Sequence, residues 1–287
     1  MAAVYKRELR SLFGGILGWA VIAGVLLVFG IYTAVLSLSK GYADFSLVPF
    51  NARFVYLIAV PLITMRTLSE ERRQHTDQLL YSSSLSSYQI VLGKYFAIVT
   101  IIAIPIALSC IYPAVLASYG RVTLTTAYSS MAAFFMMGTA LCAAGLYFSS
   151  ISQNQFVSAA ISFGALIICY FANELQTLFS SGLPAAVIFF TVLAVALGAV
   201  MRVMTKSWGA ALLAFAVPEI ILLAVYALAP SVLDGSVAAA ISSVAVFSRL
   251  ETFCNGIFDI PALIYCLSFA WLFVFFSIQA FEKRRWS

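Results

Sequence analysis

The chain has 287 residues, of which 63% are hydrophobic and only 9% are charged. Soluble domains carry about 25% charged residues, so this composition excludes an ordinary soluble protein. The net charge of +5 does not indicate nucleic-acid binding, because its meaning lies in where the basic residues fall between the apolar runs. We therefore expect membrane lipids, and no nucleic acid, around this chain.

Long apolar runs dominate the sequence. A helix needs about 20 apolar residues to cross a hydrocarbon core about 30 Å thick. The sequence predicts an all-α polytopic membrane protein with about eight transmembrane helices, forming a single transmembrane domain over residues 1–287. The predicted spans are 15–37, 53–68, 91–117, 126–149, 155–173, 184–201, 208–229 and 262–281.

Basic residues fall mostly on one side of these spans. Threading eight spans with the N-terminus inside places twelve of the sixteen lysines and arginines on one side. The four on the other side are Lys40, Arg53, Arg121 and Arg249. Loops rich in lysine and arginine stay in the cytoplasm, so both termini are predicted to be cytoplasmic.

The first 14 residues mix basic and apolar side chains. Lys6, Arg7 and Arg10 alternate with residues such as Val4 and Leu9. This pattern is typical of a short helix in the headgroup layer, with its basic side chains toward anionic lipid. The alternative is a solvated flank that only sets the orientation of the chain.

A polar segment, residues 66–80, follows the second span directly. Within it, Glu70 and Gln74, and Arg73 and Asp77, are four residues apart, so each pair lies on adjacent turns of one helix. A charged segment of this length in so apolar a chain predicts a docking surface in water. The alternative is an ordinary solvated loop without a partner.

Serines 82–84, 86 and 87 then interrupt the helix, because their hydroxyl groups compete for backbone hydrogen bonds. Ser86 and Gln89 match a capping box that would start the next helix. The sequence thus predicts a cytoplasmic coupling region over 69–89, built as a helix, a turn and a second helix.

Two later segments have their own features. Residues 184–229 are mostly apolar. As one helix they would be more than twice as long as the hydrocarbon core is thick, so the segment must fold back. The turn is predicted at Arg202–Lys206, although a re-entrant arrangement stays open. Residues 231–261 form the largest predicted extracytoplasmic segment, whose apolar part suits a helix on the outer membrane surface.

The chain lacks motifs for chemistry of its own. It has no phosphate-binding loop, no G-x-S-x-G elbow and no H-E-x-x-H zinc motif, so we predict no catalytic site, no bound cofactor and no metal. Glu219 is an acid inside a predicted span, which marks a possible translocation site. It could instead be protonated, hydrogen-bonded to a neighbouring helix, or placed at the wall of a water-filled cavity. A stand-alone secondary carrier or channel using Glu219 is the alternative function, and a structural or sensory subunit is a third.

Six separated motifs, in order, resemble the permease subunits of type-2 ABC exporters, and most closely the gliding-motility-associated permeases. The resemblance covers nearly the whole chain. The motifs are YKRELRSLF at 5–13, PLITMR at 61–66 with SEER at 69–72, TDQLL at 76–80, IVLGKY at 90–95, NQ at 154–155 and EKRRWS at 282–287.

This resemblance implies a bacterial plasma-membrane exporter made of two permeases and two ATP-binding subunits. Residues 1–14 would be the elbow helix, and the coupling helix would enter a groove of the separate ATPase, which binds ATP and magnesium. The second permease could be identical or different, and an extracellular accessory subunit could join. The implied ATPase-coupling residues are Ser69, Glu70, Glu71, Arg72, Arg73, His75, Thr76, Asp77, Leu79 and Leu80.

Two features depart from the family pattern. Where relatives commonly carry Ser-Pro in the turn, this chain has Ser83 and Ser84. The family core has six spans, so the hairpin at 184–229 is an addition. The few polar residues in the spans favour a lipid-like, hydrophobic or peptide cargo over a small ion.

Overall fold

The computed structural model is helical throughout the residues that it describes, which contain no strand. The predicted all-α fold is therefore confirmed. The described part divides into two compact units, residues 1–170 with 246–287 and residues 171–245, and the single transmembrane domain stays a prediction. The described residues are 1–38, 45–73, 86–120, 122–178, 187–192, 194–195, 198–199, 202, 208–228 and 236–285.

Five helical stretches in the described residues are long and apolar enough to cross a membrane. Each coincides with a predicted span, because length and hydropathy alone decide whether a helix fits the hydrocarbon core. The chain is an integral membrane protein on this evidence. The five stretches are Ile16–Ser37, Ser87–Tyr119, Leu124–Ile151, Gln155–Ala172 and Ile260–Lys283.

The other three predicted spans are not settled by the structure. The span predicted at 53–68 corresponds to helix α4, Val55–Thr64, of ten residues. It follows a short helix α3, Leu47–Ala52. The span predicted at 184–201 lies partly outside the described residues, and the last corresponds to α12, Trp208–Leu228. The total of eight spans stays a prediction.

A sharp corner joins the first two helices. Helix α1, Ala2–Gly14, is followed by the single residue Gly15, after which α2, Ile16–Thr33, begins. Helix α2 continues as a π-helical turn, η1, Ala34–Leu38. A Cβ atom added to Gly18 would lie 2.5 Å from the carbonyl oxygen of Leu12. Only glycine allows so close an approach, so the corner depends on this residue.

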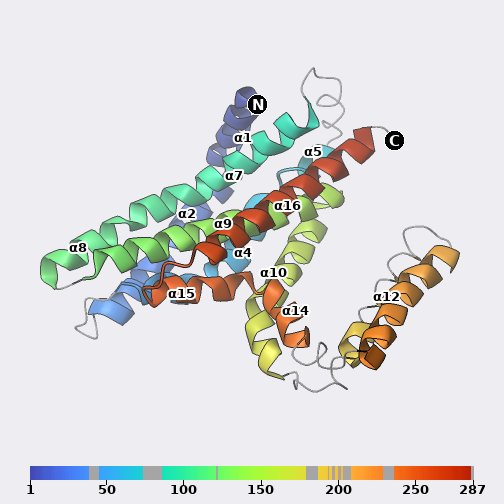
Figure 1. Ribbon diagram of the computed structural model, residues 1–287. Helices are drawn as coiled ribbons and strands as arrows, with labels where there is room; N and C mark the ends of the chain where they lie inside the picture. Colours follow the sequence, from blue (N-terminus) through green and yellow to red (C-terminus); the bar gives the residue numbers. More distant parts are fainter. Residues whose placement is uncertain are drawn as a thin grey trace. The chain divides into compact units, whose positions relative to one another are not determined.

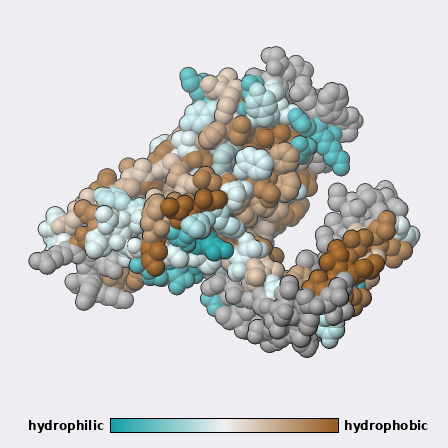
Figure 2. Space-filling view, in the orientation of Figure 1, coloured by the Kyte–Doolittle hydropathy of each residue, from teal (hydrophilic) through white to brown (hydrophobic). Residues whose placement is uncertain are grey.

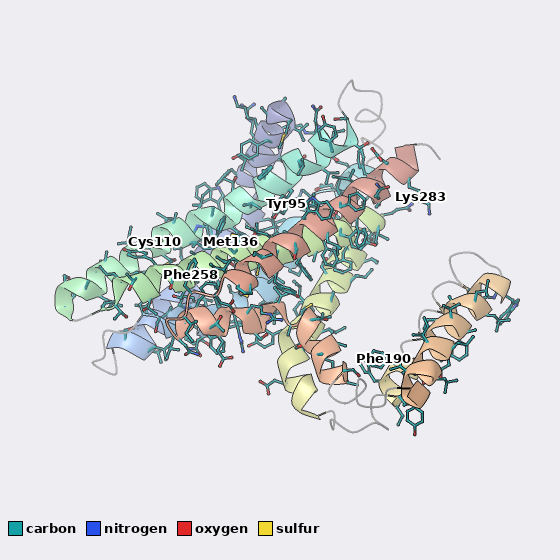
Figure 3. The ribbon with its side chains drawn as sticks, in the orientation of Figure 1. Tyr95, Cys110, Met136, Phe190, Phe258 and Lys283 are labelled. Carbon is teal, nitrogen blue, oxygen red and sulfur yellow. The ribbon has the colours of Figure 1, made fainter. Side chains whose placement is uncertain are left out.

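Helix α7, Ser87–Ser109, begins at the predicted capping box. Ser86 has the extended backbone of an N-cap residue, and the Gln89 side chain accepts a hydrogen bond from the Ser86 backbone N–H at 3.4 Å. Helix α8, Ile111–Tyr119, continues beyond Cys110, which Figure 3 labels at the junction. Pro113 cannot donate to the carbonyl four residues before it, which explains a break at this point.

Helix α9, Leu124–Ile151, lies at the centre of the first unit. Helix α16, Ile260–Arg285, runs beside α9 in Figure 1, and the packing between these two helices is the most extensive between any two described elements. Helices α7 and α4 also pack on α9. Small residues on α9 let α4 approach closely: a Cβ atom on Gly138 would lie 2.4 Å from the Tyr56 hydroxyl oxygen. Close backbone approach at small residues is how membrane helices pack.

Short helices precede α16 in the predicted extracytoplasmic segment. They are α14, Ser236–Val244, then the 3₁₀ turn η2, Val246–Arg249, and α15, Leu250–Cys254. A Cβ atom on Gly256, whose φ is +81°, would lie 3.7 Å from the Thr126 side chain at the start of α9. This contact places the α15–α16 turn at the N-terminal end of α9.

The second unit is small and apolar. Leu222 of α12 and Val237 of α14 form its buried cluster, against which Phe190 packs; Figure 3 labels this phenylalanine. The surface of α12 carries exposed apolar side chains, drawn in brown in Figure 2, including Leu212 and Ile220. Helix α10, Gln155–Leu178, runs from the first unit into the second.

Candidate coupling site

Lys94 is the centre of a buried ionic junction between three helices. Its side chain is 0% exposed, although it stands within the first apolar turns of α7. The ammonium group donates to Glu8 Oε1 at 2.8 Å and to the Thr67 carbonyl oxygen at 2.7 Å, and Glu71 Oε2 lies 2.9 Å away. Two of its three N–H donors therefore make hydrogen bonds, and the contact with Glu71 Oε2 is an ion pair.

Arg7 completes the junction from α1. Its guanidinium group pairs with Glu8 Oε1 at 3.1 Å and also with Glu71 Oε1. The two cations balance the two carboxylates, so the cluster is neutral as a whole. Buried charges are tolerated only when they are paired and hydrogen-bonded. The junction therefore ties α1, α7 and the segment after α4 to one another, and we call these four residues the ionic junction.

Helix α5, Ser69–Arg73, contributes Glu71 to this junction. The Ser149 hydroxyl oxygen at the end of α9 accepts hydrogen bonds from the backbone N–H groups of Leu68 at 3.2 Å and Ser69 at 3.3 Å. Arg72 donates to the Ser152 carbonyl oxygen at 3.3 Å. These bonds stop α4 from continuing as one helix and fix α5 against α9.

Glu70 and Arg66 form a pair on the exposed side. The guanidinium group of Arg66 donates to both carboxylate oxygens of Glu70, at 2.7 and 3.1 Å. This hydrogen-bonded pair lowers the pKa of the Glu70 carboxyl group from its ordinary value, an effect that partial burial opposes. The carboxylate therefore stays ionised at neutral pH, and an exposed pair of this kind stabilises a fold by at most about 1 kcal/mol.

The structure separates the predicted coupling residues into two groups. Ser69 and Arg72 are buried, and Glu71 takes part in the ionic junction, so these three pack within the chain. Arg73 is exposed. Gln74–Leu80, which contains His75, Thr76, Asp77, Leu79 and Leu80, lies outside the described residues, and its docking role stays a prediction.

Two junction residues were not singled out from sequence. Glu8 was grouped with a basic N-terminal segment that was expected to face lipid headgroups, yet Glu8 is only 9% exposed. Its spacing of four from Val4, which is also buried, is the signal that could have placed it on the inner face of α1. From sequence, Lys94 was counted with the charged cluster expected to form a docking surface in water, yet its side chain is 0% exposed.

Glu219 lies in the second unit, away from any such cluster in the described residues. The Thr191 hydroxyl group donates to Glu219 Oε1 at 3.2 Å, whereas Oε2 is buried without a hydrogen bond. This hydrogen bond agrees with one of the alternatives for Glu219, and its role in translocation stays a prediction. No basic side chain pairs with Glu219 among the residues described, so an ion relay gains no support here.

The fold and this site define an all-helical membrane protein with an ion-paired junction at one end of its main unit. Residues 33–173 match the model of a family described as ABC-2 family transporter protein. The match runs from the end of α2 to α10 and includes α5 and Lys94. It supports an ABC-2 type permease, which is a membrane transport component and not itself catalytic.

Permeases of this family generally work with ABC ATP-binding subunits. No curated protein and no solved structure matches the chain significantly. The family match does not favour the stand-alone carrier.

Proposed function

We propose that this chain is the transmembrane permease subunit of an ATP-driven exporter, coupled to a separate ATPase through residues 69–89. The observation that carries the proposal is the family match over 33–173. ATP and magnesium would be bound by the ATPase, and a second permease would complete the translocation path. The same proposal places the chain in the bacterial plasma membrane, with eight spans and both termini in the cytoplasm. It also includes the likeness to gliding-motility-associated permeases.

The ionic junction supports a mechanism for the coupling. Any displacement of α5 acts on α7 through Glu71 and Lys94, on α1 through Arg7, and on α9 through Arg72 and the Leu68–Ser149 hydrogen bond. A push from a partner on the 69–89 region is therefore passed to three helices at once. Since α9 packs along α16, the movement would reach the centre of the bundle.

Arg73 offers a test that leaves this packing intact. Because Arg73 is exposed and follows the anchored residues, the variant Arg73→Glu should insert and fold normally. A reversed charge at a charged interface costs several kcal/mol, so stimulation of the co-expressed ATPase should fall by about tenfold or more. The measurement is ATP hydrolysis of the purified complex in nanodiscs.

The matched control is Glu251→Arg, which reverses an exposed charge on α15. Helix α15 is at the N-terminal end of α9, and the 28 residues of α9 span about 42 Å at 1.5 Å per residue. This variant should keep full coupled hydrolysis. Equal hydrolysis in Arg73→Glu and the unchanged complex would contradict the proposed docking region.

A further inference from the structure

The second unit contains an apolar groove with Arg202 at its edge, which is the cation among its described lining residues. The groove has a volume of about 460 Å³ and lies along α12, whose apolar surface Figure 2 shows in brown. Ligand sites commonly measure about 300–1,000 Å³, so the groove has the size of a site. Its described lining residues are Val195, Gly198, Ala199, Arg202, Trp208, Leu212 and Phe215.

Among the described residues, the contact that holds Arg202 is with an aromatic ring and uses none of its hydrogen-bond donors. Its guanidinium carbon lies 4.4 Å from the centre of the Trp208 ring, over the ring face. A cation on an aromatic face is oriented by the ring quadrupole, and no described residue accepts a hydrogen bond from the N–H groups at the guanidinium edge. No ion pair with any described residue neutralises this arginine, and no acid is among the described lining residues.

We infer that this groove binds an anionic phospholipid of the surrounding membrane. The guanidinium group would hold the phosphate through paired N–H donors, a geometry that arginine matches well. An acyl chain would lie along Val195, Leu212 and Phe215. Trp208 is 69% exposed, and tryptophan is enriched where the hydrocarbon region meets the headgroups, so the headgroup belongs at the arginine end.

The charge at the edge argues for a lipid over a covering protein segment. An apolar helix laid in the groove would bury the guanidinium group without a partner, which is costly. An anionic amphiphile satisfies both the cation and the apolar wall. The site does not depend on the proposed export function, because it lies within the second unit.

Photo-crosslinking of lipids tests the inference on the full-length chain in phosphatidylcholine nanodiscs. Probes with a photoactivatable acyl chain are compared, one with a phosphatidylglycerol and one with a phosphatidylcholine headgroup, and labelled peptides around Trp208–Phe215 are quantified by mass spectrometry. We expect the anionic probe to label the groove about tenfold more strongly, the factor that about 1.4 kcal/mol gives.

Three variants sharpen the result. Arg202→Gln should abolish the preference for the anionic probe while labelling by the zwitterionic probe persists. Ala199→Phe, which places a ring in the groove, should reduce labelling by both. Lys283→Gln removes an exposed cation elsewhere and should change neither. Equal labelling by the two probes, an unlabelled groove in the unchanged chain, or a preference that survives in Arg202→Gln would each overturn the inference.

Discussion

Replacing Lys94 with methionine is expected to destabilise the chain by about 3–5 kcal/mol, because removing one member of a buried ion pair leaves the other uncompensated. Lys94 neutralises Glu8 and Glu71 together, and Arg7 alone cannot balance both carboxylates. The Thr67 carbonyl oxygen also loses its donor. The free energy of unfolding in mixed micelles, followed by intrinsic fluorescence, is the measurement.

A double variant separates the ionic effect from a loss of packing. Glu8→Gln in the Lys94→Met background removes one of the stranded charges, so it should recover part of the lost stability. The control is Lys6→Met, which removes an exposed cation from the same helix as Glu8 and should change stability by less than about 0.5 kcal/mol. A Lys94→Met chain as stable as the Lys6→Met chain would show that the junction is absent.

The second large effect is expected at the contact between α4 and α9. A Cβ atom on Gly138 would lie 2.4 Å from the Tyr56 hydroxyl oxygen, and one on Gly145 would lie 2.6 Å from the Thr64 hydroxyl oxygen. Tyr56 cannot move aside easily, because it is 0% exposed and donates to the Phe134 carbonyl oxygen at 3.0 Å. Its ring also stacks on that of Phe134, with 4.5 Å between centroids.

Alanine at each glycine should therefore cost about 1–3 kcal/mol through overpacking, and the double variant Gly138→Ala with Gly145→Ala should cost at least as much as the larger single change. The two positions are seven residues apart on one face of α9, so they push α4 in the same direction. Thermal unfolding monitored by size-exclusion chromatography in one detergent is a suitable measurement.

The controls for this contact come from other helices. A Cβ atom on Gly24 of α2 or Gly164 of α10 would meet nothing within 4 Å. Alanine is favoured over glycine in a helix interior by about 0.5–1 kcal/mol, so Gly24→Ala and Gly164→Ala should be neutral or slightly stabilising. A Gly138→Ala chain that matches these controls would mean that α4 and α9 do not pack as closely as described.

The long spans were predictable because a helix that crosses a bilayer needs about 20 consecutive apolar residues, and such runs can be counted in the sequence. Leu124–Ile151 and Ile260–Lys283 differ from their predicted bounds by only two residues at each end. The start of α7 was also predictable, since Ser86 and Gln89 are close in sequence and their capping interaction is local.

The interruption between α4 and α5 could not be predicted in the same way. The polar segment was predicted to follow the second span directly and to be helical, yet residues 65–68 form a turn before α5. The backbone N–H groups of Leu68, in this turn, and of Ser69, at the start of α5, find an acceptor in the Ser149 hydroxyl oxygen, about 80 residues away along the chain. A contact of that separation leaves no periodic signal in the local sequence.

The sequence predicted only part of the candidate site correctly. The polar segment at 66–80 marked the region, and Glu71 and Arg72 were expected to face a partner. The structure gives these two residues partners inside the chain, Lys94 and the Ser152 carbonyl oxygen. A charged residue looks alike in sequence whether its counter-charge is internal or external, so only the tertiary structure distinguishes an anchor from a docking residue.

The most direct test of the coupling proposal is a crosslinking measurement at Arg73. A photoreactive amino acid would replace Arg73 in one chain and Asn255, exposed at the other end of α9, in a matched chain. With the ATP-binding subunit co-expressed, the account predicts a covalent adduct to that subunit from position 73 and none from position 255. An adduct from position 255 alone, or no adduct from position 73 in an assembled complex, would contradict it.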